Sequence, residues 1–380
     1  MVVQSYACRN GGSVRVTFRA DASVQIGTGH VMRCLTLAEE LRRQGHKCLF
    51  ICRKHEGHLE SLITQMGFDL HLLCSPEQSD TFARDEQAPA HIEWLGVSWQ
   101  TDAKQTFEVL TRYNTDWLVV DHYALDAKWE RQLAEVVGQI MVVDDLADRN
   151  HYCAMLLDQN LGRETADYDE RVPPTCEKLI GPLYALLRPE FAELRPISLE
   201  RRRSMELKRI LVSMGGVDRN NITGQVLETL SVSDLPKEVE LDIIMGGSAP
   251  HVEAVKKQAA ELPFPSRVDV NVSNMAERMC AADFSIGAAG STSWERCCLG
   301  LPSIMILLAN NQKLIGAALK SAGCAELSSI SEVNVRVRDV IIKINKQRSV
   351  LKKMSGNSQK VCDGKGCLRV VAALNHGKWG

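Results

Sequence analysis

A short strand that leads through a glycine-rich turn into a helix is the feature that most constrains the fold of this chain. Residues Val14–Phe18 alternate apolar and polar side chains, and Gly27–Gly29 can form a turn. From Val31 to Leu41 apolar residues recur at helical spacing, and Gly45 follows as a helix stop. The pattern predicts the first strand and helix of a layered α/β domain.

Two later apolar runs have the pattern of strands that are buried on both faces. Residues 117–120 are continuously apolar and end at Asp121, and residues 140–143 repeat this pattern and end at Asp144. Helical segments alternate with these strands along the first half of the chain. This succession predicts a parallel sheet with helices on both sides.

The second half begins with the same succession of a strand, a glycine-rich turn and a helix. A strand at Arg209–Ser213 leads into Gly215 and Gly216, and a helix follows from about Asn221. We therefore predict an α/β fold class with two doubly wound domains that face each other across a cleft. Ligands of such sheets bind beyond the carboxyl ends of the strands, so the cleft is the predicted site.

A charged, polar stretch marks the expected boundary between the domains. Residues 195–207 have this composition, and we predict that they form a linker. The predicted domains span residues 14–194 and 207–355. Residues 356–380 are predicted to be a helical segment that packs back on the N-terminal domain. We expect the first thirteen residues to be a frayed tail.

Composition excludes several classes of function. Apolar residues make up 45% of the chain, charged residues 24%, and the net charge is −2. A nucleic-acid-binding protein would show an excess of Lys and Arg. No apolar stretch approaches the roughly 18–20 residues of a membrane span. The 13 cysteines form no CxxC pair, which fits buried free thiols in a reducing compartment, so we expect a cytoplasmic protein.

His30 closes the first glycine turn, Gly27-Thr28-Gly29. Glycines at this place let a ligand approach the backbone, and a helix N-terminus favours a negative group. The positive end of the helix dipole also disfavours an imidazolium cation, so His30 could accept a proton. Alternatively, His30 simply packs at the top of the apolar stripe of its helix. Spacing alone leaves both interpretations open.

Two glycine turns in the second half could bind phosphate. Gly215 and Gly216 could cradle a diphosphate, or form a tight turn in which Asp or Asn caps the next helix. Residues 287–295 join an apolar strand to a short helix and contain Gly290 and Ser291. Glu295, one turn into that helix, could accept hydrogen bonds from both ribose hydroxyls. Thr292 and Glu295 also fit a capping box.

Polar residues follow the two buried strands of the first half. Asp121, His122 and Tyr123 end one strand, and strand-end residues face the predicted cleft, although Asp121 or His122 could equally be satisfied structural groups. The carboxylates of residues 144, 145 and 148 could hold Mg²⁺. A polar strand end and turn explains these carboxylates better, and no other part of the sequence requires a metal.

Taken together, these segments resemble the UDP-2,4-diacetamido-2,4,6-trideoxy-β-L-altropyranose hydrolases of pseudaminic acid biosynthesis. The resemblance runs from about residue 14 to residue 325, and the ordered set of segments is more specific than any one of them. The segments that carry it are Phe18–Asp21, Gln25–His30, Val120–Tyr123, Asp144-Asp145, Gly181, Tyr184–Phe191, Met214–Asp218, Gly290–Glu295 and Asn311-Gln312.

The resemblance implies a pair of Rossmann-like domains of the glycosyltransferase B (GT-B) type. It implies that His30 is the catalytic base, that a water attacks C1 of the sugar with inversion, and that no cofactor or metal takes part. The implied partner is a small UDP-sugar, bound by a monomer that binds neither nucleic acid nor membrane. Implied substrate-binding or orienting residues are Arg19, Asp21, Gly29, Tyr123, Arg188 and Asn311, and implied UDP-binding residues are Gly215, Gly216, Gly290, Ser291 and Glu295.

Two other functions fit parts of the same pattern. A glycosyltransferase of this fold would pass the sugar to an acceptor other than water. If that acceptor were a lipid, we would expect an apolar, basic-rimmed run in the first domain, and residues 50–110 contain none. A non-catalytic UDP-sugar-binding module would keep the glycines and Glu295 but would not need His30.

Overall fold

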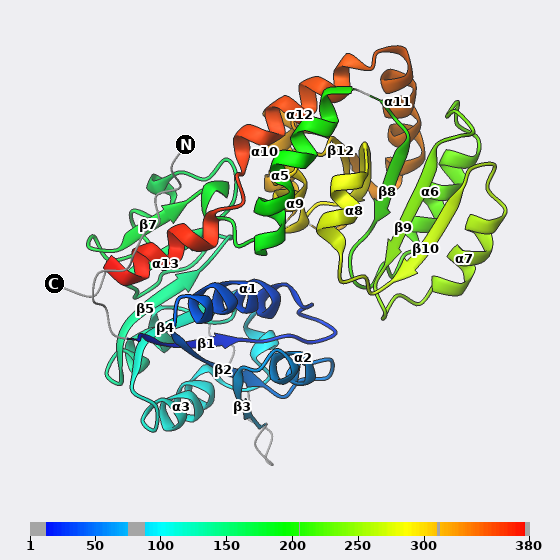
Figure 1. The fold of residues 1–380 in the computed structure, drawn as a ribbon. Helices are drawn as coiled ribbons and strands as arrows, with labels where there is room; N and C mark the ends of the chain where they lie inside the picture. The colour runs from blue at the N-terminus through cyan, green and yellow to red at the C-terminus, as the bar shows by residue number, and fades with distance from the viewer. Residues whose placement is uncertain (1–12, 75–87, 205, 310–311, 377–380) are drawn as a thin grey trace. The chain divides into compact units, whose positions relative to one another are not determined.

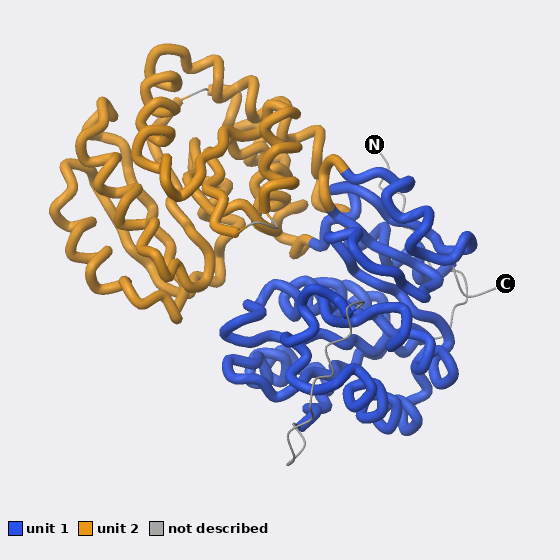
Figure 2. Tube along the Cα trace, turned by 180° about the vertical axis from the view of Figure 1, so that it is seen from behind, with its two compact units in different colours: residues 1–159, 163–186, 367–380 blue, residues 160–162, 187–366 orange. Residues whose placement is uncertain are grey.

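The computed structural model describes residues 13–74, 88–204, 206–309 and 312–376. The chain divides into two compact units, each built on one parallel sheet (Figures 1 and 2). Unit 1 comprises residues 1–159, 163–186 and 367–380, and unit 2 comprises residues 160–162 and 187–366. The predicted α/β class with two doubly wound domains is confirmed.

Unit 1 contains a seven-stranded sheet in the order β3-β2-β1-β4-β5-β6-β7, in which every neighbouring pair is parallel. Its strands are β1 (Arg15–Ala20), β2 (Lys47–Arg53), β3 (Asp69–Leu73), β4 (Thr115–Asp121), β5 (Val137–Val143), β6 (Met155–Asp158) and β7 (Glu177–Ile180). Its helices are α1 (Gly29–Arg43), α2 (Glu60–Gln65), α3 (Trp99–Leu110), α4 (Ala127–Leu133) and α13 (Gly366–His376), with short 3₁₀ turns η1 (Ile92–Leu95), η2 (Thr165–Tyr168) and η3 (Pro182–Tyr184).

The central strand β4 is buried on both faces, as its continuous apolar sequence predicts. Trp117 and Val119 belong to the core that α1 and α13 cover, whereas Leu118 and Val120 belong to the core that α3 and α4 cover. Successive side chains of a strand point to opposite faces, so an unbroken apolar run is what two covered faces require. The strand therefore delivers Asp121 to the carboxyl edge of the sheet from a rigid position.

Unit 2 contains a six-stranded parallel sheet in the order β10-β9-β8-β11-β12-β13. Its strands are β8 (Arg209–Ser213), β9 (Glu240–Met245), β10 (Ser266–Val270), β11 (Phe284–Ala288), β12 (Ser303–Leu307) and β13 (Ala325–Ser329). Its helices are α5 (Pro189–Arg201), α6 (Ile222–Ser231), α7 (Val252–Ala260), α8 (Met275–Ala281), α9 (Thr292–Cys298), α10 (Gln312–Ser321), α11 (Val333–Lys346) and α12 (Ser349–Val361), with 3₁₀ turns η4 (Arg202–Ser204) and η5 (Ile330–Glu332).

The expected linker at residues 195–207 is wrong for most of its length, because helix α5 and the turn η4 extend through residue 204. The arginines that make this stretch look like a linker bind backbone carbonyls of unit 2. Arg195 donates to the carbonyl of Gln359, and Arg202 donates to the carbonyls of Leu299 and Ala282. These charged side chains satisfy orphan carbonyl groups at helix ends, so their composition does not signal exposure.

Helix α13 returns the end of the chain to unit 1. Val370, Val371 and Leu374 are at most 1% exposed, and the indole N–H of Trp117 donates to the carbonyl of Leu374 at 3.2 Å. The cysteines in the described ranges are free thiols, most of them buried. None of the helices in those ranges combines the length and apolar character that a bilayer-spanning helix needs.

The docking of α13 predicts an asymmetry between two leucines of that helix. Leu374 is 1% exposed and Leu368 is 43% exposed. Leu374→Ala should lower the free energy of unfolding by about 2–5 kcal/mol, because it removes a buried side chain and leaves a cavity. Leu368→Ala should change it by less than about 0.5 kcal/mol. Denaturant unfolding of both variants measures this, and equal effects would contradict the docking.

Candidate functional site

The carboxyl edge of the unit 1 sheet joins His30 to Asp121. His30 is the second residue of α1, Gly29 is the first, and Asp121 ends β4. His30 Nδ1 lies 2.6 Å from Asp121 Oδ1, and the two residues are 7% and 0% exposed. A carboxylate on Nδ1 fixes the ring orientation and leaves Nε2 as the nitrogen that can exchange a proton. The alternative interpretation, in which His30 only packs at the top of the apolar stripe of its helix, does not account for its hydrogen bond with Asp121.

Arg33 holds this carboxylate in its ionised form. Its Nε and Nη2 atoms each lie 2.6 Å from one oxygen of Asp121, and its Nη1 lies 3.0 Å from Asp145 Oδ2. Burial by itself would raise the pKa of Asp121. The charges of Arg33 and His30 more than offset this effect and hold the pKa well below its ordinary value. An anion of this kind stabilises positive charge on His30 when the ring accepts a proton.

Tyr123 supports His30 from the side. The two rings meet edge to face, with centroids 4.6 Å apart and an interplanar angle of 88°. The Tyr123 hydroxyl donates to Asp145 Oδ1. Burial and the neighbouring Asp145 raise the pKa of the phenol, so the hydroxyl remains a donor. The structure thus brings Tyr123 to His30 through its ring rather than through its hydroxyl group.

Arg19 and Asp21 lie in a separate buried network. Arg19 pairs with Asp21 at 2.6 Å and with Asp102 at 2.7 Å, and Arg53 pairs with Asp102 at 2.6 Å. Asp21 also accepts a hydrogen bond from the backbone N–H of Arg53. All four residues are fully buried. Their recorded contacts tie β1, β2 and α3 together and do not include His30, so any orienting effect on His30 is indirect.

The carboxylates of residues 144–148 are held by side chains rather than arranged around a cation. Asp144 pairs with Arg149 at 2.9 Å and accepts a hydrogen bond from the backbone N–H of Ala147. Asp145 faces Arg33 and Tyr123. Within the described ranges, no three His, Cys, Asp or Glu side chains are grouped to hold a metal ion. These contacts fit the polar strand end that the sequence favours.

In unit 2, the turn after β8 combines an open glycine pair with a helix cap. Gly215 has a φ of +88°, which favours glycine, and a Cβ built on Gly215 or Gly216 would meet no atom within 4 Å. Asp218 accepts hydrogen bonds from two backbone N–H groups at the start of α6, and Asn221 caps the same helix. The capping interpretation is confirmed for these two residues, and it leaves the glycines free for another role.

The alternative interpretation of Thr292 and Glu295, as a capping box, is wrong. The N-cap residue of α9 is Ser291, and its side chain accepts no capping hydrogen bond. A Cβ built on Gly290 would also meet no atom within 4 Å. Burial raises the pKa of Glu295 to about 6, although the charge of Arg188 opposes this effect. Glu295 is therefore a carboxylate that titrates near neutrality at the start of a helix.

Arg188 is the residue before α5 and shares unit 2 with Glu295. It pairs with Glu190 at 3.0 Å and lies 5.4 Å from the centre of the Phe191 ring. The positive charge of Arg188 lowers the pKa of Glu295, against the effect of burial. Asn311 lies outside the described residues.

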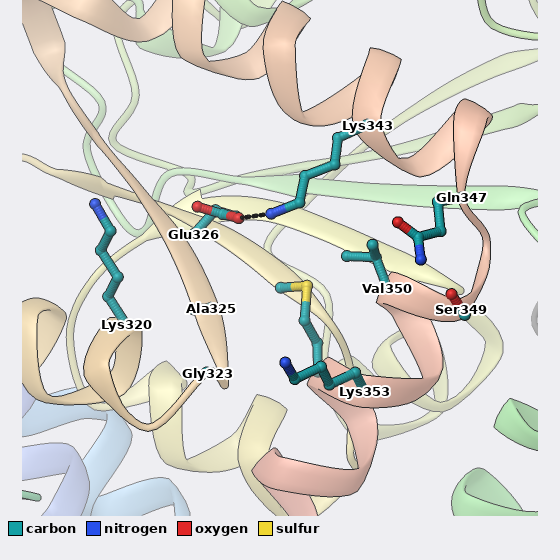
Figure 3. Close-up of a pocket in the computed structure, with 10 residues that line it drawn as sticks. Lys320, Gly323, Ala325, Glu326, Lys343, Gln347, Ser349, Val350 and Lys353 are labelled. Atoms are coloured by element: carbon teal, nitrogen blue, oxygen red, sulfur yellow. Dashed lines mark hydrogen bonds and ion pairs between the residues drawn. The ribbon is translucent and has the colours of Figure 1, made fainter.

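A separate cavity of about 410 Å³ opens between α10, β13, α11 and α12 of unit 2 (Figure 3). Lys320, Lys343 and Lys353 line it, together with Glu326. Lys343 is bound to Glu326 at 2.6 Å. None of the predicted site residues lines this cavity.

The main residue that sequence reasoning missed is Arg33. It follows His30 by three positions, so the two share one face of α1, and this spacing was the available signal. Asp121 was a strand-end candidate with no assigned partner. Two residues whose rings contact Tyr123, His91 and Trp94, come from a segment that carries no recognisable motif.

Solved structures with similar folds include a named glycosyltransferase and a protein bound to UDP. MurG of Acinetobacter baumannii matches with a TM-score of 0.67 and 14% identity, over 96% of this chain and 100% of that one. The calicheamicin glycosyltransferase CalG4 matches with a TM-score of 0.61 and 14% identity, over 97% and 99%. The S. aureus MnaA–UDP structure matches with a TM-score of 0.60 and 11% identity, over 96% of each chain. The chain therefore has a fold of the GT-B class.

Two named proteins are similar to this chain in sequence over most of its length. The chain is 26% identical over 311 residues to the UDP-2,4-diacetamido-2,4,6-trideoxy-β-L-altropyranose hydrolase of Campylobacter jejuni. The match covers 82% of this chain and 97% of that protein. It is 26% identical over 364 residues to the spore coat polysaccharide biosynthesis protein SpsG of Bacillus subtilis, over 93% and 96%. The resemblance to the hydrolase is confirmed. No family model matches the chain.

An uncharacterized protein of Methanocaldococcus jannaschii is also similar, with 23% identity over 299 residues and 77% of this chain. The chain spans about half of that relative's length, because the match covers 55% of it.

The pairing of Asp121 predicts a pH-dependent loss of stability in Asp121→Asn. The folded-state pKa of Asp121 is lowered, so its stabilising contribution is present above the ordinary Asp pKa of about 3.9 and is lost as pH falls below it. The wild type should exceed Asp121→Asn in free energy of unfolding near pH 7, and the difference should shrink below about pH 4.

Denaturant unfolding at several pH values measures this difference. Asp69→Asn is the matched control, because Asp69 is an exposed carboxylate on the edge strand β3 of the same sheet. It should change the free energy of unfolding by less than about 0.5 kcal/mol. A difference for Asp121→Asn that stayed constant with pH would exclude the ionised pair as its source.

Proposed function

We propose that this protein hydrolyses UDP-2,4-diacetamido-2,4,6-trideoxy-β-L-altropyranose to UDP and the free sugar, a step of pseudaminic acid biosynthesis. The observation that carries the proposal is the buried Asp121–His30 pair at the carboxyl edge of the unit 1 sheet. The similarity to the Campylobacter jejuni hydrolase supports the same reaction. The protein is accordingly proposed to be an enzyme that acts on a nucleotide sugar.

In the proposed reaction, His30 acts as a general base. Its Nε2 takes a proton from a water placed against C1 of the sugar, and Asp121 stabilises the imidazolium that forms. The water oxygen bonds to C1 on the side opposite the leaving group, so the anomeric centre inverts. The C1–O bond breaks, and its electron pair leaves with the UDP group. Tyr123 and Arg33 hold His30 and Asp121 in place.

Unit 2 is proposed to bind the UDP group. Backbone N–H groups at Gly215, Gly216 and Ser291 would donate to the diphosphate and stabilise the charge that develops on it. Gly290, whose own N–H donates to the Ser293 hydroxyl, would let the diphosphate approach the start of α9. The open space around these glycines supports a close approach by a ligand. Glu295 would accept hydrogen bonds from the ribose hydroxyls. Arg188 and Asn311 are both proposed to contact the substrate.

A glycosyltransferase is the second candidate, because solved glycosyltransferases share the fold. Incubation with the UDP-sugar and no acceptor separates the two functions. A hydrolase releases UDP at the same rate whether or not an acceptor is added, and NMR of the first product identifies the sugar and its inverted anomer. Release of UDP that required an added acceptor would reject the hydrolase. Binding of the UDP-sugar with no turnover in either case would leave a non-catalytic binding module.

His30→Ala is expected to lower kcat by roughly a hundredfold or more, because it removes the general base. Its Kd for the UDP-sugar should stay close to that of the wild type. His58→Ala is the control, since His58 lies in the same unit, contacts only its neighbour Glu60 in the recorded contacts, and should leave kcat unchanged. Turnover is measured by UDP release and binding by calorimetry. A His30→Ala enzyme with near-normal kcat would reject this role.

The raised pKa of Glu295 predicts how UDP binding depends on pH. The carboxyl group is ionised above about pH 6 and protonated below it. Ionised Glu295 accepts two hydroxyl hydrogen bonds, so UDP affinity should weaken as pH falls through 6. Hydrogen bonds to a charged group contribute about 1.5–3 kcal/mol, so Glu295→Gln should lower affinity roughly 10- to 100-fold at pH 8.

UDP also changes its charge with pH, but this effect on Kd is the same for Glu295→Gln and for the wild type. The ratio of the two Kd values therefore cancels it. Calorimetry from pH 5 to pH 8 should show this ratio approaching one at the acidic end. A ratio that does not vary with pH would mean that Glu295 does not bind the ribose as an anion.

A further inference from the structure

Three aromatic side chains form a continuous surface beside the proposed base. The ring centroids of His91 and Trp94 are 4.3 Å apart, and those of His91 and Tyr123 are 5.5 Å apart. Trp94 and Tyr123 are 5.8 Å apart and tilted by only 30°. Tyr123 in turn packs against His30. We call His91, Trp94 and Tyr123 the aromatic platform.

The platform is built from two elements that the core holds in place. Trp94 lies on the turn η1, whose Leu95 is fully buried, and Val97 directly after it is 1% exposed. Gly96 ends η1 with a φ of +74°, which favours glycine. Tyr123 follows the buried strand β4. A platform held from both sides can present its rings to a ligand with little loss of side-chain entropy on binding.

The rings of the platform present apolar faces. The Tyr123 hydroxyl is occupied by Asp145, while His91 and Trp94 are partly exposed. Burial lowers the pKa of His91, and nearby Arg149 and His30 add to this effect against the opposing charge of Asp148. The His91 ring is therefore neutral at neutral pH. Partly exposed aromatic rings next to a catalytic group are typical of a ligand pocket.

We propose that the aromatic platform binds the sugar ring of the substrate and selects sugars with apolar substituents. The proposal rests on the proposed hydrolase function, which places the sugar carbon C1 beside His30. A 2,4-diacetamido-6-deoxy sugar carries three methyl groups, two on its acetamides and one at C6, where common hexoses carry hydroxyls or a hydroxymethyl group. The faces of these rings hold methyl groups and offer no partner for hydroxyls, which would lose their hydrogen bonds to water when they lie against a ring face.

Trp94→Ala tests the platform through the sugar-dependent part of binding. Kd values for UDP and for the UDP-linked diacetamido sugar are measured by calorimetry in the His30→Ala background, in which turnover of the substrate should be slowed roughly a hundredfold or more. One methylene-sized contact in an apolar pocket changes discrimination roughly 10- to 200-fold. We expect Trp94→Ala to weaken binding of the UDP-sugar at least tenfold and to leave the Kd for UDP unchanged.

Two further variants separate a loss of sugar recognition from a general disturbance of the folded unit. Trp94→Phe keeps an aromatic face and should recover most of the lost affinity. Trp99→Ala removes another partly buried tryptophan of the same unit that has no recorded ring contact with Tyr123, and it should leave the ratio of the two Kd values unchanged. With His30 restored, Trp94→Ala should raise KM more than it lowers kcat.

Selectivity is read from competition by UDP-N-acetylglucosamine, which keeps hydroxyls at C4 and C6. Trp94→Ala should narrow the preference for the diacetamido sugar over this competitor about tenfold. An unchanged Kd ratio and unchanged preference in Trp94→Ala would overturn the platform even if the wild type hydrolyses the substrate. If the wild type releases no UDP from any sugar, the hydrolase fails, and the binding ratios still decide the platform.

Discussion

One buried carboxylate, that of Asp121, organises the candidate site of unit 1. It binds His30 through one oxygen and is clamped by the guanidinium of Arg33 across both. Taking such a charge out of water is costly unless it is paired and hydrogen-bonded, and here the pairing keeps it ionised. The position of β4 at the centre of the sheet makes this arrangement rigid. Arg33 extends it to Asp145, and Asp145 to Tyr123, so four side chains fix the orientation of one imidazole ring.

The same edge of the sheet carries a second set of charges with a different role. Arg19, Asp21, Arg53 and Asp102 pair with one another in a fully buried cluster, and their contacts join two strands to a helix. Both sets look alike in sequence, since each combines charged residues at or near strand ends with charged residues on a helix. Burial distinguishes them, because His30 keeps 7% of its surface exposed while the Arg19 cluster keeps none. We therefore place the proposed chemistry at His30 and assign the Arg19 cluster to the scaffold.

The proposed division of labour follows from what each unit offers. Unit 1 presents a proton acceptor and an aromatic surface, which suit a sugar and a water. Unit 2 presents open glycines and the carboxylate of Glu295, which suit a diphosphate and a ribose. Hydrolases and glycosyltransferases of this fold differ in what accepts the sugar, so similarity of fold alone does not choose between them. The dyad could deprotonate either kind of acceptor, and the similarity to the Campylobacter jejuni hydrolase is what favours water.

The sequence by itself determined the fold class and named His30, Asp121 and Tyr123 as candidates for the site. Strand and helix periodicity are local properties, so the apolar run before Asp121 and the stripe after Gly29 could be assigned without coordinates. Three features needed the tertiary structure. The partner of His30, which lies on α1, is 91 residues away at the end of β4, and only the parallel pairing of β1 with β4 brings the two together. The charged stretch expected as a linker is helical, because its arginines bind distant carbonyl groups. The aromatic platform unites residues from a short turn and a strand end, and neither segment carries a pattern that links it to the other.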